Sequence, residues 1–246
     1  MSSVFARTGS PQRRRRPAAR PAAVLAVVLA SLSAAACAAG ASRARLENPV
    51  AVARDVRAAT TPEGPWRLTL GWDYADERGP VGGEGVLRYT PPDSLRLDLF
   101  GPGDGAMAVA LTGGRLRSRG QIRDVQIPPP AFLHAAAGLF RPGRERPDEG
   151  WREGDVRVLV YRSADAELRF RLRGDRVVRV EERRGGREVR RLHLRWPDAD
   201  SASRWPGSAE FRDRARESRA RWTVRRARPA DTPFSPEIYD LPTASP

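Results

Sequence analysis

The 246-residue sequence contains no lysine, so all 44 of its basic residues are arginine and give a net charge of +14. Alanine, glycine and proline are also abundant, and this composition is typical of a GC-rich genome. The arginines are spread along the whole chain, and no zinc-knuckle or RNA-recognition motif accompanies them. The positive charge by itself therefore does not predict nucleic-acid binding, and we expect no nucleic-acid partner.

Cysteine and histidine are nearly absent, with one and two residues. A single cysteine excludes an internal disulfide framework. His134 and His193 have no serine, cysteine or metal-ligand cluster near them in sequence, which favours structural roles. The carboxylate pairs Asp76-Glu77, Asp148-Glu149 and Glu181-Glu182 lie in predicted turns or strand ends among arginines, where solvated charge pairing accounts for them. We predict no enzyme activity, no metal and no cofactor. The alternative is a hydrolase of envelope polymers, which would need His134 or one of these carboxylates.

No apolar run is long enough to cross a bilayer, which takes about 20 residues. The longest run, Ala22 to Leu32, is interrupted only by Ser31 and follows the basic cluster Arg13-Arg14-Arg15-Arg16. Small residues lead from it to Cys37, which is the layout of an export signal. We predict a signal peptide over residues 1–36, and its removal from 246 residues leaves 210. An exported protein meets anionic lipid headgroups or lipopolysaccharide rather than nucleic acid.

Ala34-Ala35-Ala36-Cys37 resembles the lipobox of bacterial lipoproteins, in which the cysteine is acylated and becomes the new N-terminus. Ala34 departs from the leucine that usually stands at that position. A secretory signal without lipidation is the alternative. The resemblance implies acylation of Cys37 and attachment to a membrane through acyl chains. Residues 37–47 are predicted to form a tether, and residues 48–246 a single domain.

Alternation of apolar and polar residues begins at Trp66 and predicts strands with one buried face. Glycine-containing pairs separate several of these runs, as in two-residue hairpins: Gly113-Gly114, Gly174-Asp175 and Gly185-Gly186. The pattern predicts an antiparallel meander. The strands are expected at residues 66–74, 85–89, 95–99, 107–111, 156–161, 168–172, 176–182 and 189–196, with a last strand at 222–224.

Two helices are expected. Asn48-Pro49 reads as an N-cap and first turn, followed by an apolar stripe of Val52, Val56 and Ala59 that ends before Thr60. The second, residues 131–140, is apolar on almost every side, which indicates a helix that is deeply buried or lines an apolar cavity. Beyond Pro233, aromatic and aliphatic residues among prolines are expected to pack irregularly against a sheet edge.

A hinge of glycine, proline and aspartate, Gly101 to Gly105, joins the two most regular apolar arms. A phosphate-binding loop would lead into a helix N-terminus. This hinge leads into another strand, so we interpret it as a hairpin turn.

The order of elements resembles the LolB-like outer-membrane lipoprotein receptors. The elements that carry the resemblance are the lipobox, the first helix, the strand 94–99, the Gly101-Pro102 turn, the returning strand 106–111 and the Ile127-Pro128-Pro129 start of the apolar helix. The ending Phe-x-x-x-x-Tyr-x-Leu-Pro resembles the wider LolA/LolB lipoprotein-carrier group. The resemblance implies a mainly antiparallel β fold, a curved unclosed half-barrel with helices that plug an apolar cavity. It also implies binding of lipoprotein acyl chains or phospholipid, delivery by a periplasmic LolA-like carrier, and a place on the periplasmic face of the outer membrane. We expect a monomer. The alternative function is an envelope adaptor or lipid-sensing lipoprotein on the same fold.

The resemblance also suggests site residues. The lipid-binding cavity is predicted from the inward-facing positions Leu68, Leu70, Trp72, Leu95, Leu97, Leu99, Met107, Val109, Leu111, Phe132, Leu133, Leu139 and Phe140; an ordinary closed core of the same residues is the alternative. The membrane-facing loop is predicted at Phe100, Gly101, Pro102, Gly103, Asp104 and Gly105. Gly103 stands where the family has an exposed leucine, so Phe100 or Val81 would have to substitute for it.

Overall fold

The computed structural model describes residues 43–122, 125–198 and 203–241. The predicted signal peptide and Cys37 lie outside these residues. In the described part of the chain, no helix has the length and apolar character needed to cross a membrane.

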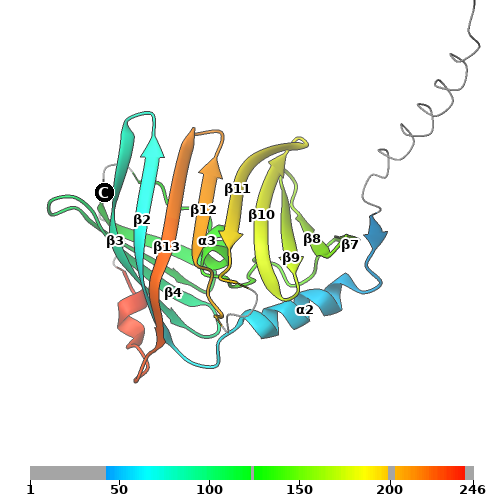
Figure 1. The fold of residues 1–246 in the computed structure, drawn as a ribbon, viewed down its shortest axis with the longest axis horizontal. Coiled ribbons are helices and arrows are strands. Elements are labelled where there is room, and N and C mark those ends of the chain that lie inside the picture. Colours follow the sequence, from blue (N-terminus) through cyan, green and yellow to red (C-terminus); the bar gives the residue numbers. More distant parts are fainter. Residues whose placement is uncertain (1–42, 123–124, 199–202, 242–246) are drawn as a thin grey trace, which may run out of the picture. The chain divides into compact units, whose positions relative to one another are not determined.

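Thirteen strands form one antiparallel sheet, which confirms the predicted fold class (Figure 1). The N-terminal strands are β1 (Ala44–Arg45), β2 (Trp66–Asp76), β3 (Gly79–Thr90), β4 (Ser94–Phe100), β5 (Ala106–Thr112) and β6 (Arg115–Gln121). The C-terminal strands are β7 (Glu149–Glu153), β8 (Val156–Arg162), β9 (Glu167–Arg173), β10 (Arg176–Arg184), β11 (Arg187–Arg195), β12 (Ser208–Asp213) and β13 (Ser218–Pro229).

The sheet consists of two meanders joined side by side. Its order is β1-β7-β8-β9-β10-β11-β12-β13-β2-β3-β4-β5-β6, so β13 pairs with β2 and the sheet stays open between its edge strands β1 and β6. Ala44 and Arg45 pair with Arg152 and Trp151 of β7, so the end of the predicted tether is part of the sheet.

Registers across the first meander align the apolar positions. Leu68 pairs with Leu87, Leu87 with Leu97, and Leu97 with Val109, which places one apolar row across β2, β3, β4 and β5. These four side chains are buried. Strict alternation therefore gives the sheet one apolar face and one arginine-rich face.

The first helix is α2 (Pro49–Thr60), and Asn48 Oδ1 accepts a hydrogen bond from Ala51 N at 2.9 Å, as predicted for its N-cap. The predicted stripe is wrong in one position because Ala59 is exposed. Thr60, four residues after the buried Val56, continues the stripe, and its hydroxyl donates to Val56 O at 2.8 Å. The helix thus includes Thr60.

The second helix is α3 (Pro130–Ala136), which is shorter than the predicted 131–140. Gly138 has φ +76° and Leu139 N donates to His134 O at 3.0 Å, the arrangement of a Schellman ending. The apolar composition of residues 131–140 does not predict where the helix ends. The helix packs against β10, β11 and β12 on the apolar face of the sheet, whereas α2 contacts β7 (Figure 1).

The C-terminal segment also differs from expectation. It forms a 3-10 turn, η2 (Pro236–Tyr239), that packs on the polar face of β4 and β5 rather than against an edge of the sheet. Tyr239 and Thr90 share a hydroxyl hydrogen bond of 2.7 Å, and Arg96 donates to Ile238 O at 2.5 Å. Polar residues of the sheet therefore fix this segment. The last strand, β13, is longer than the predicted 222–224, and β1, β6, β7 and β12 were not predicted.

Candidate functional site

The thirteen predicted cavity residues come together in one core. They lie on β2, β4, β5 and the segment that contains α3, and none is more than 7% exposed. The C-terminal meander adds apolar residues to the same core, among them Phe170, Leu192, Phe211 and Trp222. The alternation of the sequence located the first half of this core, whereas the residues of β9 to β13 were not named because their strands are rich in arginine.

Side chains fill this core in the structure. A cavity of about 10 Å³ is left where Trp72, Leu97, Leu133 and Trp222 meet. A single water molecule needs about 10–15 Å³. The conformation is therefore that of a closed core, and binding of an acyl chain to these residues stays a prediction that requires part of the core to move.

The α3 segment, which we define as residues 129–141, packs on the apolar face of the sheet. Its interior contacts are apolar. The ring centroids of Phe132 and Phe211 lie 5.3 Å apart and those of Phe140 and Phe170 lie 4.9 Å apart, in each case as an edge-to-face pair. Such pairs contribute about 0.5–1.5 kcal/mol beyond their burial. These aromatic contacts attach the segment to the apolar face of the sheet.

Polar contacts fix the α3 segment to the β3–β4 turn. His134 Nε2 lies 3.0 Å from the carbonyl oxygen of Asp93. Arg141 donates through one guanidinium nitrogen to Pro92 O at 2.8 Å and to Thr61 Oγ1 at 2.6 Å. The segment is therefore tied down by a few hydrogen bonds to neighbouring turns.

A contact to α2 completes the attachment. The backbone N–H of Phe140 donates to Thr60 Oγ1 at 3.1 Å. Sequence reasoning missed all of these partners because they are separated from the α3 segment by 41 to 80 residues. No local motif encodes such contacts.

An apolar groove of about 210 Å³ runs beside the α3 segment. Ala131 and Phe132 line it on one side, and Tyr161 and Leu168 on the other. The Tyr161 hydroxyl is buried and has no hydrogen-bond partner among the residues that the structure describes, and burial raises its pKa. A buried donor without an acceptor costs about 1–3 kcal/mol. A ligand that carries an acceptor, such as an acyl ester, would remove that cost.

Acidification is expected to weaken the attachment of α3. Burial lowers the pKa of His134 below its ordinary value, with Arg141 adding to the effect. The unfolded chain, in which the histidine pKa is ~6.5, binds a proton that the folded chain does not bind. The free energy of unfolding therefore falls as the pH drops below about 6.5, by at most ~1.4 kcal/mol per pH unit. Urea unfolding followed by tryptophan fluorescence between about pH 7.5 and about pH 5 measures this slope.

Substitutions of the two histidines separate their contributions to that slope. His134→Gln is expected to lose most of the pH dependence. His193→Gln serves as its control, because His193 is exposed although its pKa is also lowered. An unchanged slope in His134→Gln would contradict the assignment.

The predicted membrane-facing loop forms a tight hairpin turn between β4 and β5. Gly101 N donates to Gly105 O at 2.8 Å, and Gly103 has φ +62°. A leucine in this left-handed conformation would cost about 1–2 kcal/mol, which is a structural reason for glycine at this position. Phe100 is 50% exposed, whereas Val81 is half-buried against the core. Of the two predicted substitutes, Phe100 is the exposed one.

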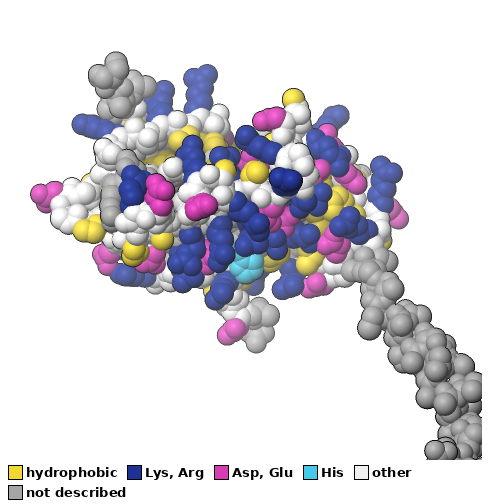
Figure 2. All heavy atoms as spheres, turned by 90° about the horizontal axis from the view of Figure 1, so that it is seen from above, with side chains coloured by type: hydrophobic (Ala, Val, Ile, Leu, Met, Phe, Trp, Pro, Cys, Tyr) yellow, Lys and Arg dark blue, Asp and Glu magenta, His cyan; other side chains and the backbone are white. Residues whose placement is uncertain are grey.

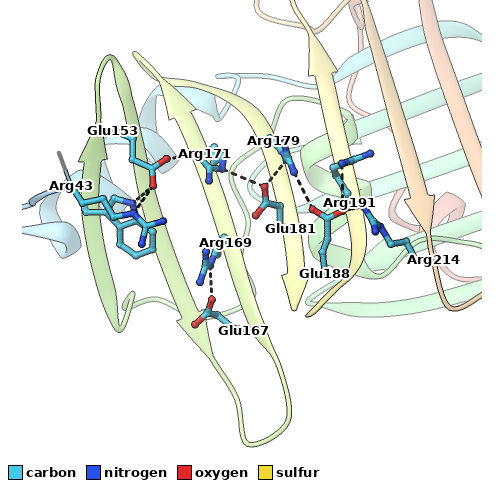
Figure 3. Close-up of polar contacts among 11 residues, drawn as sticks. Arg43, Glu153, Glu167, Arg169, Arg171, Arg179, Glu181, Glu188, Arg191 and Arg214 are labelled. Atoms are coloured by element: carbon cyan, nitrogen blue, oxygen red, sulfur yellow. Dashed lines mark hydrogen bonds and ion pairs between the residues drawn. The ribbon is translucent and has the colours of Figure 1, made fainter. Parts of the chain in front are cut away.

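Of the carboxylates considered for catalysis, Asp76, Glu149, Glu181 and Glu182 form ion pairs with arginine. An ion-pair ladder, defined as Arg43, Glu153, Arg171, Glu181, Arg179 and Glu188, crosses the polar face of the sheet with N–O distances of 2.5 to 3.3 Å (Figure 3). Glu181 and Glu182 are buried, contrary to the expectation that solvent surrounds them. Arginine covers them, since Glu182 pairs with Arg184 and Arg190 at 2.9 Å.

Comparison with known proteins supports the fold. No protein-family model and no curated protein matches the sequence. A LolA superfamily protein from Nitrosomonas europaea matches with 11% identity and a TM-score of 0.50, over 80% of this chain and 98% of that one. A DUF1329 family protein from Desulfovibrio piger matches with 9% identity and a TM-score of 0.50, also over 80% and 98%. The chain therefore shares the fold of a LolA superfamily protein.

Proposed function

We propose that this protein is a lipid-anchored protein of the cell envelope that binds acyl chains of lipoproteins or phospholipid and takes part in lipoprotein localisation to the outer membrane. The observation that carries the proposal is the α3 segment. It covers the apolar face of an open sheet with aromatic and aliphatic side chains, and hydrogen bonds from His134 and Arg141 hold it in place.

The energetics of acyl chains make such a cover useful. Each methylene removed from water contributes about 0.8 kcal/mol, so an acylated protein cannot cross an aqueous compartment without an apolar cavity. In our proposal an acyl chain enters at the groove beside Phe132 and Leu168 and displaces the α3 segment. Release of the chain restores the closed core, which makes hand-over reversible.

The remaining parts of the proposal concern partners. A periplasmic LolA-like carrier would deliver the cargo, acylation of Cys37 would hold the protein on the periplasmic face of the outer membrane, and Phe100 would contact the membrane surface. The fold shared with the Nitrosomonas protein supports a carrier role. We propose no enzymatic step, because Glu181, Glu182 and His134 have structural partners.

Depletion of the protein tests the function. If it sorts lipoproteins, depletion should leave other lipoproteins in the inner membrane or the periplasm, as measured by membrane fractionation, and re-expression of the wild-type chain should restore their distribution. Native mass spectrometry after mild purification should also show bound phospholipid or fatty acid. Normal sorting after depletion would reject the receptor role.

An adaptor role is the second candidate, and the closed core favours it. The cavity of about 10 Å³ between Trp72, Leu97, Leu133 and Trp222 is as small as the gaps in an ordinary close-packed protein interior. If depletion leaves sorting intact and no lipid accompanies the purified protein, the envelope adaptor is the better description.

A further inference from the structure

The polar face of the sheet changes character at β11. On the β7–β10 side, each carboxylate of the ion-pair ladder lies between arginines (Figure 3). Glu188 is the last acid of that series and also pairs with Arg191 and Arg214. Beyond it, over β11, β12 and β13, arginines outnumber the acids.

A groove of about 460 Å³ lies in this region of the polar face. Its charged lining consists of five arginines and one glutamate: Arg179, Arg191, Arg195, Arg212, Arg221 and Glu210. Ligand pockets typically measure about 300–1,000 Å³, so the groove has room for a small ligand. Figure 2 shows arginine side chains gathered around the exposed histidine of this face.

Glu210 orders two of the arginines. It accepts ion pairs from Arg212 at 2.6 Å and from Arg221 at 2.9 Å. The hydrogen bond from Arg221, with that from Arg212, lowers the pKa of Glu210 to about 2, so it stays ionised. Arg195 makes no ion pair among the residues that the structure describes. The groove therefore keeps an excess of positive charge at fixed positions.

We propose that this groove binds a phosphate ester, recognised as a phosphate or pyrophosphate group by Arg191, Arg195 and their neighbours. A guanidinium group presents a planar fork that matches phosphate oxygens in a bidentate manner. Arg179 and Arg191 pair with Glu188, and Arg212 and Arg221 pair with Glu210. An anion at this place would add a partner for Arg195, the groove arginine that has no acid among the described residues. The site lies on the sheet face opposite to the apolar core, so it does not depend on the proposed function.

His193 supplies a reporter within the groove. Burial lowers its pKa, as do Arg195 and Arg191 of its own strand and Arg179 of β10, whereas Glu210 of β12 acts in the opposite direction. A bound phosphate dianion would favour the imidazolium form and raise the pKa of His193. His134 lies on the other side of the sheet and should not respond.

Calorimetric titration of the full mature chain with inorganic pyrophosphate tests the site. The variant R191Q/R195Q is expected to bind at least about tenfold more weakly than wild type, which corresponds to about 1.4 kcal/mol. R54Q/R173Q is the matched control, because it removes the same charge from two exposed arginines that do not line the groove. Histidine NMR titration should show a raised pKa for His193 only in the proteins that bind.

Vesicles distinguish the sources of the phosphate. Flotation with vesicles of phosphatidylcholine and phosphatidate in equal parts, compared with phosphatidylcholine alone, measures binding to a lipid phosphate. A lipid headgroup is supported if the wild-type protein floats with the phosphatidate vesicles, if R191Q/R195Q does not, and if pyrophosphate displaces the wild-type protein from them. Pyrophosphate binding without vesicle binding supports a soluble phosphate ester. Equal weakening in the two double variants, or no binding of either probe, would overturn the proposal.

Discussion

Replacing Gly83 by alanine is expected to destabilise the fold by about 2–4 kcal/mol, since overpacking costs ~1–3 kcal/mol and a lost hydrogen bond adds ~1 kcal/mol. A Cβ atom at this position would lie 1.9 Å from Phe100 O and 3.2 Å from Trp72 Nε1. The first of these atoms belongs to the backbone of β4, which pairs with β3 and has little freedom to shift.

The clash would also disturb a polar contact that joins three strands of the first meander. Trp72 Nε1 donates to Glu84 O at 3.0 Å and to Phe100 O at 3.2 Å, and in this way joins β2, β3 and β4 above the core. The buried Trp72 ring loses its partners if β3 and β4 separate. The hairpin that carries Phe100 would then be loosened as well.

Thermal unfolding followed by far-UV circular dichroism measures this effect. In a domain of this size, a loss of about 3 kcal/mol lowers the Tm by about 6–12 °C. Gly64→Ala is the matched control, because a Cβ atom there would meet no atom within 4 Å. If the two variants unfold at the same temperature, the close approach of Gly83 to Phe100 does not exist in solution.

The sequence predicted strands correctly where one face of the strand is buried and the other is exposed to solvent. Leu95, Leu97 and Leu99 of β4 alternate with polar residues, and all three are buried as predicted. In β12 the inward residues Ala209 and Phe211 are few and stand among charges, so the pattern gave no strand there. Periodicity reports burial only when enough apolar residues repeat.

The contacts between distant segments at the site could not be predicted from the periodicity of the sequence. The His134 ring accounts for part of the closure of the core, but its partner is the Asp93 carbonyl, a backbone group that any residue could supply. The groove arginines come from β10, β11, β12 and β13, and their convergence depends on strand registers that alternation does not specify. Such sites follow from topology rather than from local sequence.

Replacing Cys37 by serine is expected to move the protein almost completely from the membrane fraction to the soluble fraction. Cys37 is the only cysteine of the chain, and it lies outside the described residues. A thioether-linked and amide-linked set of acyl chains anchors a protein stably, whereas a domain without them has only weak surface attraction to a membrane. Fractionation of cells, together with metabolic labelling by a palmitate analogue, measures both anchoring and acylation.

Phe100→Ala is the companion variant that separates anchoring from membrane contact. It keeps Cys37 and should stay in the membrane fraction, but it removes the exposed ring at the end of β4 and should slow the release of cargo into the membrane. The Cys37→Ser protein should still bind lipid in its core, because the cavity residues are unchanged. If Cys37→Ser stays in the membrane fraction and carries no less label than wild type, acylation at Cys37 is wrong and a secretory signal without lipidation takes its place.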